Sequence, residues 1–190
     1  MTVAARTYLD PRTEAFMADV LAAIDAHASL LGAFVVGSGA AGGFDPGTSD
    51  VDLVVVVDGP PRDRRALVAE VAALPSPVRD LELVVYVQGR RPGDFELNLN
   101  HGVERPDAEP FWFVLDAALA QEHAVPVWGE RPWSEFFEPV GPEEIHEAMQ
   151  ASLDWAGRQR PEDEFARQQA ARARHYLEHG EWITKKEAQA

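Results

Sequence analysis

The stretch FVVGSGAAGGFDPGTSDVDLVVVV, residues 34–57, joins two apolar runs through a segment rich in glycine. Both runs are short and rich in valine, which is typical of buried strands. Asp50 and Asp52 stand at the start of the second run, and residues i and i+2 of a strand point to the same face. Paired carboxylates suit a hard divalent cation such as Mg²⁺, which in turn binds phosphates. The stretch therefore predicts nucleotide chemistry.

Gly37 and Ser38 directly follow the first apolar run. Small residues allow backbone N–H groups to approach phosphates closely, so this turn is a candidate phosphate site. Taken separately, the aspartate pair is compatible with a polar strand end, and GGFDPG is an ordinary loop composition. The combination at this spacing, between two buried strands, favours the functional interpretation.

A third candidate carboxylate, Glu82, lies in the run LELVVYV at residues 81–87. A crossover connection can bring this predicted strand beside the one that begins with the aspartates. A carboxylate within an apolar run is costly to bury without a partner, and a metal ion or a catalytic task would supply one. The alternative is a glutamate on an edge strand that faces water.

Composition limits the possible functions. The 190 residues include no cysteine, which excludes disulfides and thiolate metal sites, and no apolar run has the length of a membrane span. The N-terminus lacks a signal-peptide core, so a cytoplasmic protein is expected. A net charge of −15 argues against binding to nucleic acid or anionic membranes and suits a cationic small substrate, although an adaptation for solubility explains it equally well.

Helical and strand patterns alternate along the first part of the chain, and the remainder is mainly helical. This order predicts an α/β domain at residues 1–138, followed by a small α-helical C-terminal domain at residues 139–190 that is either unusually short or truncated. The expected helices are residues 14–30, 63–74, 111–123, 143–156 and 162–179. The expected strands are 33–36, 53–57, 81–87 and 125–128, and residues 95–100 also alternate like a strand.

The motifs together resemble the nucleotidyltransferase superfamily, whose mark is Gly-Ser, a spacer, Asp-x-Asp and a carboxylate on a later strand. Within it, the chain is similar to the aminoglycoside (3'')(9) adenylyltransferases. The further residues that carry this similarity are Ser49, Glu96-Leu97-Asn98, the segment EHAVPVWG at 122–129, Arg172, Tyr176, Gly180 and Thr184-Lys185. The resemblance implies a mixed sheet with flanking helices and a helical C-terminal domain.

The resemblance also implies an activity, the transfer of AMP from ATP to an antibiotic hydroxyl with release of pyrophosphate. Asp50 and Asp52 would hold two Mg²⁺ ions, and Glu82 would be the general base. The residues implied to bind the nucleotide are Gly37, Ser38, Ser49, Arg172 and Lys185.

The implied acceptor is a polycationic aminoglycoside, and by register Glu162 would pair with its ammonium groups; a capping role at a helix start is the competing interpretation. Relatives that accept streptomycin carry a tryptophan at about the position of Gly102, which favours spectinomycin over streptomycin and leaves a different hydroxylated substrate open. A monomer without nucleic-acid or membrane partners is expected. Two other hypotheses are a nucleotidyltransferase that modifies a protein or RNA, and a non-catalytic nucleotide-binding protein.

Overall fold

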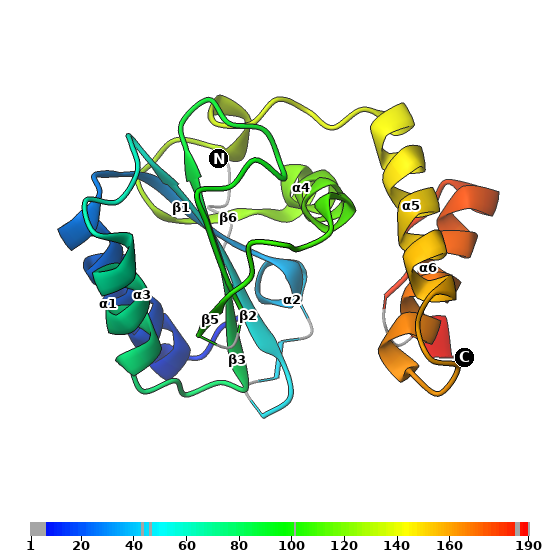
Figure 1. Cartoon of the computed structure of the whole chain (residues 1–190), viewed down its shortest axis with the longest axis horizontal. Helices are drawn as coiled ribbons and strands as arrows, with labels where there is room; N and C mark the ends of the chain where they lie inside the picture. Colours follow the sequence, from blue (N-terminus) through cyan, green and yellow to red (C-terminus); the bar gives the residue numbers. More distant parts are fainter. Residues whose placement is uncertain (1–6, 43, 46, 101, 185–186, 190) are drawn as a thin grey trace, which may run out of the picture. The chain divides into compact units, whose positions relative to one another are not determined.

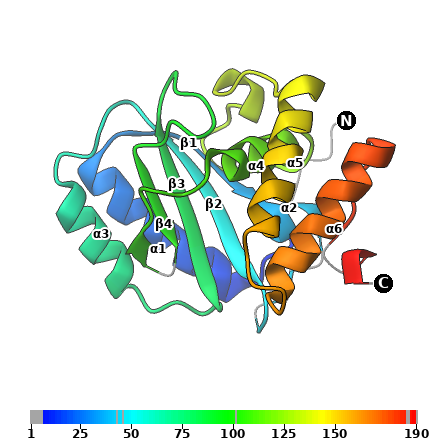
Figure 2. The ribbon, with the colours of Figure 1, turned by 45° about the vertical axis from the view of Figure 1, so that its right-hand side comes forward.

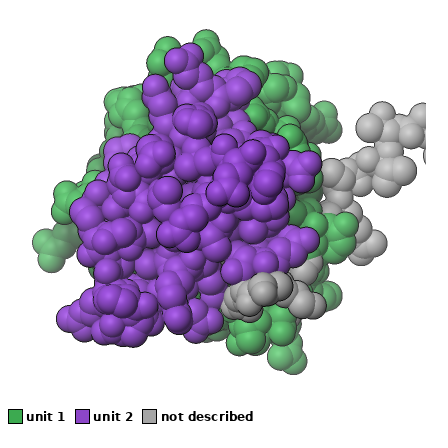
Figure 3. Space-filling model, turned by 90° about the vertical axis from the view of Figure 1, so that its right-hand side faces the viewer, with its two compact units in different colours: residues 1–108, 119–139 green, residues 109–118, 140–190 purple. Residues whose placement is uncertain are grey.

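The computed structural model describes residues 7–42, 44–45, 47–100, 102–184 and 187–189. Its backbone contacts divide the chain into two compact units, which Figure 3 colours separately. The first unit is Met1–Ala108 with Leu119–Pro139, and the second is Glu109–Ala118 with Val140–Ala190. The domain boundary at residue 138 stays a prediction, because a compact unit is not by itself an independently folding domain.

Six described strands of the first unit form one mixed sheet in the order β5-β4-β3-β2-β1-β6. Strands β2 and β3 are parallel, and the other neighbouring pairs are antiparallel. This sheet with its flanking helices confirms the predicted fold class. The strands are β1 (Leu30–Val36), β2 (Asp50–Val57), β3 (Asp80–Val87), β4 (Leu97–Asn100), β5 (Val103–Glu104) and β6 (Val125–Trp128).

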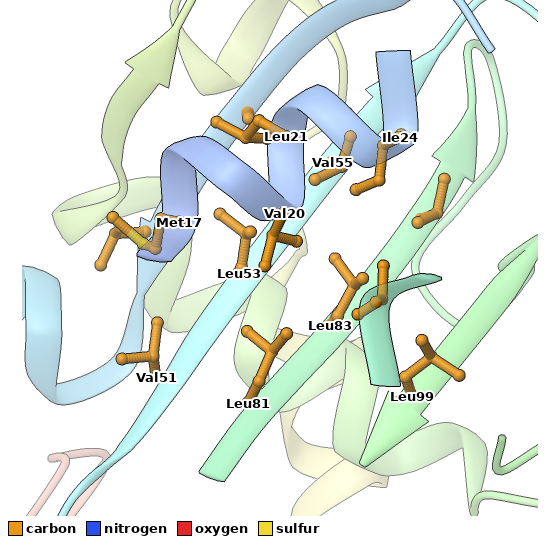
Figure 4. Close-up of a cluster of buried hydrophobic side chains, with 14 of the residues drawn as sticks. Met17, Val20, Leu21, Ile24, Val51, Leu53, Val55, Leu81, Leu83 and Leu99 are labelled. Atoms are coloured by element: carbon orange, nitrogen blue, oxygen red, sulfur yellow. The ribbon is translucent and has the colours of Figure 1, made fainter. Parts of the chain in front are cut away.

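Helices α1 (Pro11–His27) and α3 (Arg64–Ala73) lie side by side over one face of this sheet (Figures 1 and 2). Asp10 caps α1 by accepting the Arg12 N–H at 2.9 Å, and Pro11 occupies the first helical position. The main hydrophobic core lies between these two helices and the sheet (Figure 4). Alternate residues of the strands contribute to it. It includes Met17, Val20, Leu21, Ile24, Val51, Leu53, Val55, Leu81, Leu83 and Leu99.

An aromatic layer covers part of the opposite face of the sheet. The Phe34 ring of β1 lies edge-on to Trp133, with ring centres 5.4 Å apart, and Trp133 stacks on Phe137 at 4.3 Å. Trp133 begins the short 3-10 helix η1 (Trp133–Glu135), in a segment that the sequence pattern indicated as a linker. A Cβ on Gly32 would come within 2.7 Å of the Phe136 ring, so β1 needs glycine there.

The second unit contains the first part of α4 (Pro110–His123), α5 (Pro142–Gly157), α6 (Glu164–His179) and the 3-10 helix η2 (Glu187–Gln189). Helix α6 begins two residues later than expected, because Asp163 caps it by accepting the Ala166 N–H at 3.0 Å. The C-cap of α6 is Gly180, which has a left-handed conformation with a φ of 71°. The core of this unit contains Phe111, Leu115, Ala118, Ile145, Ala148, Met149 and Ala173.

Residues 37–41 form a short helix, α2 (Gly37–Ala41), where the sequence pattern indicated only a glycine-rich turn. Ala40 is buried, and the Gly39 carbonyl accepts the Tyr8 N–H at 2.9 Å. A helix this short is unstable alone, so tertiary packing and not local propensity maintains it. Among the helices of the described ranges, none combines the length and hydropathy that crossing a membrane requires.

Candidate active site

Strands β2 and β3 place their acidic residues at the same end and on the same face of the sheet. The register pairs Asp50 with Asp80 and Asp52 with Glu82. Val51 and Leu53 point to the helix-covered core, so Asp50 and Asp52 point to the opposite face. Glu82 is an inner-strand residue, because β3 pairs with β2 on one side and β4 on the other. The alternative of an edge-strand glutamate is therefore wrong.

Gly37 lies directly against the carboxylate of Asp52. Its φ is +58°, a conformation that L side chains rarely adopt, and a Cβ at this position would overlap Asp52 Oδ2 and lie 2.9 Å from Asp52 Cγ. Val36, the last residue of β1, is the register partner of Asp52. The first residue of α2 therefore lies against the Asp52 carboxylate, and glycine is the residue that allows this close approach.

Asp50 is engaged by a basic residue that the sequence analysis did not single out. Arg79 Nε lies 3.1 Å from Asp50 Oδ1 in an ion-pair contact, and Arg79 Nη2 donates to Asp50 Oδ2 at 3.4 Å. The Asp50 side chain is 18% exposed and the Arg79 side chain 59%. Arg79 stands immediately before β3, so the parallel pairing that brings the acidic residues together also brings their counter-charge.

Two more polar side chains of the same face were missed. Asp80, the register partner of Asp50, is buried and accepts the Leu81 N–H at 2.9 Å. Asn100 of β4 is the register partner of Glu82, and its Nδ2 donates to Glu82 Oε1 at 2.9 Å. The spacing Asp80-x-Glu82 repeats that of Asp50-x-Asp52, a signal that could have indicated Asp80 before the structure was known.

Ser38 and Ser49 lie on the two sides of the loop between β1 and β2. Ser38 is the second residue of α2 and is half-buried. The Ser49 hydroxyl accepts the Asp45 N–H at 3.0 Å, while the Ser49 N–H donates to the Asp45 carbonyl at 2.7 Å. Ser49 therefore stabilises the turn that leads into Asp50.

The donor set is suited to magnesium. In the part of the chain that the structure describes, no three His, Asp or Glu side chains form a closed metal cage. Magnesium does not require one, because it is commonly held by one or two carboxylates together with water and substrate phosphates. Asp50 and Asp52 offer hard oxygen ligands one strand step apart, so these residues fit a metal that is completed by a nucleotide.

The remaining predicted residues belong to the second unit. Arg172 donates from Nε to the Ile183 carbonyl at 3.1 Å and from Nη1 to Gln169 Oε1 at 3.3 Å. Burial lowers the pKa of its guanidinium, and the charge of Asp116 opposes this shift. Glu162 is exposed and precedes the capping residue of α6, so it is not the cap itself. Lys185 lies outside the described residues.

Two comparisons with known proteins bear on this site. The family model described as "Nucleotidyltransferase domain" matches residues 20–98, the part of the chain that contains Asp50, Asp52 and Glu82. The crystal structure of spectinomycin adenyltransferase AAD(9) from Enterococcus faecialis, solved with ATP and spectinomycin, is similar at a TM-score of 0.76 and 18% identity, over 93% of this chain and 79% of that one. No curated protein sequence matches significantly.

Residues 20–98 therefore match a nucleotidyltransferase domain, and the prediction of an enzyme of this class is confirmed. Over 93% of the chain, the fold is similar to that of the spectinomycin adenyltransferase structure.

Proposed function

We propose that this enzyme transfers AMP from ATP to a hydroxyl of an aminoglycoside or aminocyclitol antibiotic, spectinomycin in preference to streptomycin, and releases pyrophosphate. The observation that carries the proposal is the pairing of β2 with β3, which places Asp50, Asp52 and Glu82 together on one face of the sheet. Two metal ligands beside a base are the groups that adenylyl transfer to a hydroxyl requires.

Each residue has a distinct task in this reaction. Glu82 accepts the proton of the acceptor hydroxyl, whose oxygen forms a bond to the α-phosphorus of ATP while the bond to pyrophosphate breaks. Asp50 and Asp52 would hold two Mg²⁺ ions, which, when bound, neutralise charge on the triphosphate. Gly37 and Ser38 would contact the β- and γ-phosphates through backbone N–H groups and the serine hydroxyl, and Ser49 would assist them.

The remaining contacts in this proposal involve Arg172, Lys185 and Glu162. Arg172 and Lys185 would bind the triphosphate. Glu162, which is exposed, would pair with an ammonium group of the antibiotic. The net charge of −15 also favours a polycationic acceptor.

Gly102 supports the preference for spectinomycin. Its φ is +65°, and a Cβ there would lie 3.5 Å from Ala72 Cβ of α3. The backbone at this position is therefore suited to glycine and strained for an aromatic residue. The tryptophan that accompanies streptomycin use in the resembling family has no equivalent at Gly102.

A direct test measures pyrophosphate release by the purified protein with ATP, Mg²⁺ and a panel that contains spectinomycin, streptomycin and other aminoglycosides. We expect release with spectinomycin, and we expect that chelation of the divalent metal abolishes it. Label from ATP that appears on a protein or RNA, with no antibiotic-dependent release, would replace the proposal by macromolecule modification. Tight ATP binding without turnover on any acceptor would indicate a non-catalytic nucleotide-binding protein.

The ion pair between Arg79 and Asp50 leads to a prediction about metal affinity. An exposed ion pair contributes about 0.2–1 kcal/mol, and Arg79 competes with the metal for the same carboxylate. We expect Arg79→Gln to tighten divalent metal binding by about 1.5- to 5-fold. Titration with Mn²⁺ in the absence of ATP, followed by electron paramagnetic resonance, measures this directly. Unchanged or weaker binding would show that Arg79 does not oppose the metal.

A further inference from the structure

Glu82 receives a hydrogen bond from a side chain of the neighbouring strand. Asn100 Nδ2 lies 2.9 Å from Glu82 Oε1, and both side chains are partly buried. The two residues are register partners in the antiparallel pair of β3 and β4. Antiparallel partners on one face have their Cβ atoms about 5 Å apart, which is within reach of an amide and a carboxylate. The contact therefore follows from the register of two strands and not from a loop.

The β3–β4 register is held by the main core. The next pair along the same ladder is Leu83 with Leu99, and both side chains are buried in the cluster beneath α1 and α3. A slip of one residue would turn these leucines away from the core, so the register is strongly specified. Asn100 is thus presented to Glu82 by a strand whose register the core specifies.

The chemistry of the Glu82–Asn100 pair determines which side chain donates the hydrogen bond. An ionised carboxylate can only accept, so the amide must present its NH₂ group to Glu82. The bond engages Oε1, and Oε2 is the oxygen that would meet the hydrogen of an acceptor hydroxyl. We infer that Asn100 is a positioning residue that holds the Glu82 carboxylate in the orientation required to accept this proton, an inference that rests on the adenylyl transfer proposed above.

A second asparagine of β4 provides a matched control. Asn98 points to the same face as Asn100, but its Nδ2 donates to the Arg105 carbonyl at 3.2 Å, and the Arg105 N–H donates back to the Asn98 carbonyl at 2.8 Å. Asn98 therefore closes the end of the β4–β5 hairpin. Its loss removes a structural hydrogen bond and leaves the contact to Glu82 in place.

The test compares Asn100→Ala, the isosteric Asn100→Asp and Asn98→Ala in the full-length chain. With the acceptor that the wild-type protein uses, we expect both changes at Asn100 to lower kcat about 10- to 100-fold, with the KM for ATP changed by no more than about twofold. Asn100→Asp should be at least as severe as Asn100→Ala, because it puts a second carboxylate where the donor was. Asn98→Ala should lower Tm and leave kcat nearly unchanged.

A double-mutant cycle with Glu82→Gln gives the decisive measurement. If Asn100 acts through Glu82, Asn100→Ala should cause little further loss of single-turnover rate in the Glu82→Gln background. Full additivity, or a kcat of Asn100→Ala equal to that of the wild type, would overturn the inference. Wild-type protein that transfers AMP to no acceptor would instead overturn the proposed function, so the two failures are distinguishable.

Discussion

Glu82→Gln is expected to lower kcat for adenylyl transfer by about 10²- to 10⁴-fold, the usual contribution of a general base. Glutamine has nearly the same shape as glutamate but cannot accept the proton of the acceptor hydroxyl. The hydrogen bond with Asn100 can persist, because the glutamine carbonyl accepts from the same Nδ2. The loss should therefore appear in kcat, with little change in ATP affinity.

Steady-state kinetics, ATP binding by calorimetry and thermal unfolding test this expectation together. Glu70→Gln is a suitable control, because Glu70 lies on α3 over the other face of the sheet, where it contacts His27 Nε2 at 3.1 Å. The control should retain its kcat. Glu82 would be ruled out as the base if the Glu82→Gln protein binds ATP normally and keeps a kcat within threefold of the wild type. A threefold change corresponds to about 0.7 kcal/mol of activation free energy.

Gly37→Ala should affect both stability and activity. An L residue in a left-handed conformation costs about 1–2 kcal/mol, and the new Cβ would also overlap the Asp52 carboxylate. Asp52 must move away, which displaces a proposed metal ligand. We expect kcat/KM to fall about 100-fold, and urea unfolding to report a loss of at least about 1 kcal/mol.

Gly89→Ala separates the two causes. Gly89 also has a positive φ, +86°, but a Cβ there would meet nothing within 4 Å. This control should lose stability through backbone strain alone and keep its kcat/KM. If Gly37→Ala behaves like Gly89→Ala, the close approach of Gly37 to Asp52 has no role in the reaction.

Local pattern was sufficient to predict most elements of this fold. The valine runs predicted β1 and β2, and the apolar run that contains Glu82 predicted β3, although each strand is longer than expected. The strands were predicted too short because polar residues such as Asp50 also belong to the hydrogen-bonded ladder. Their place in the ladder is visible only when the neighbouring strand is known. The short helix α2 was missed because glycine favours no regular structure locally.

The acidic residues of the candidate site could be found from the sequence, but their partners could not. Arg79 has no distinguishing local pattern, and the strand-like alternation around Asn100 does not indicate a role for its side chain. These two residues belong to the candidate site because Arg79 contacts Asp50 and Asn100 donates to Glu82. The roles proposed for all these residues stay predictions until the variants are measured.

Residue type and the period of a single strand are local properties, so the residues able to perform the chemistry, and the side chains of one strand that share a face, are predictable from the amino-acid sequence. The row formed by Asp52, Glu82 and Asn100 is visible only in the folded chain. The register between strands depends on the packing of leucine and valine side chains far apart in the sequence, and no local periodicity contains that information.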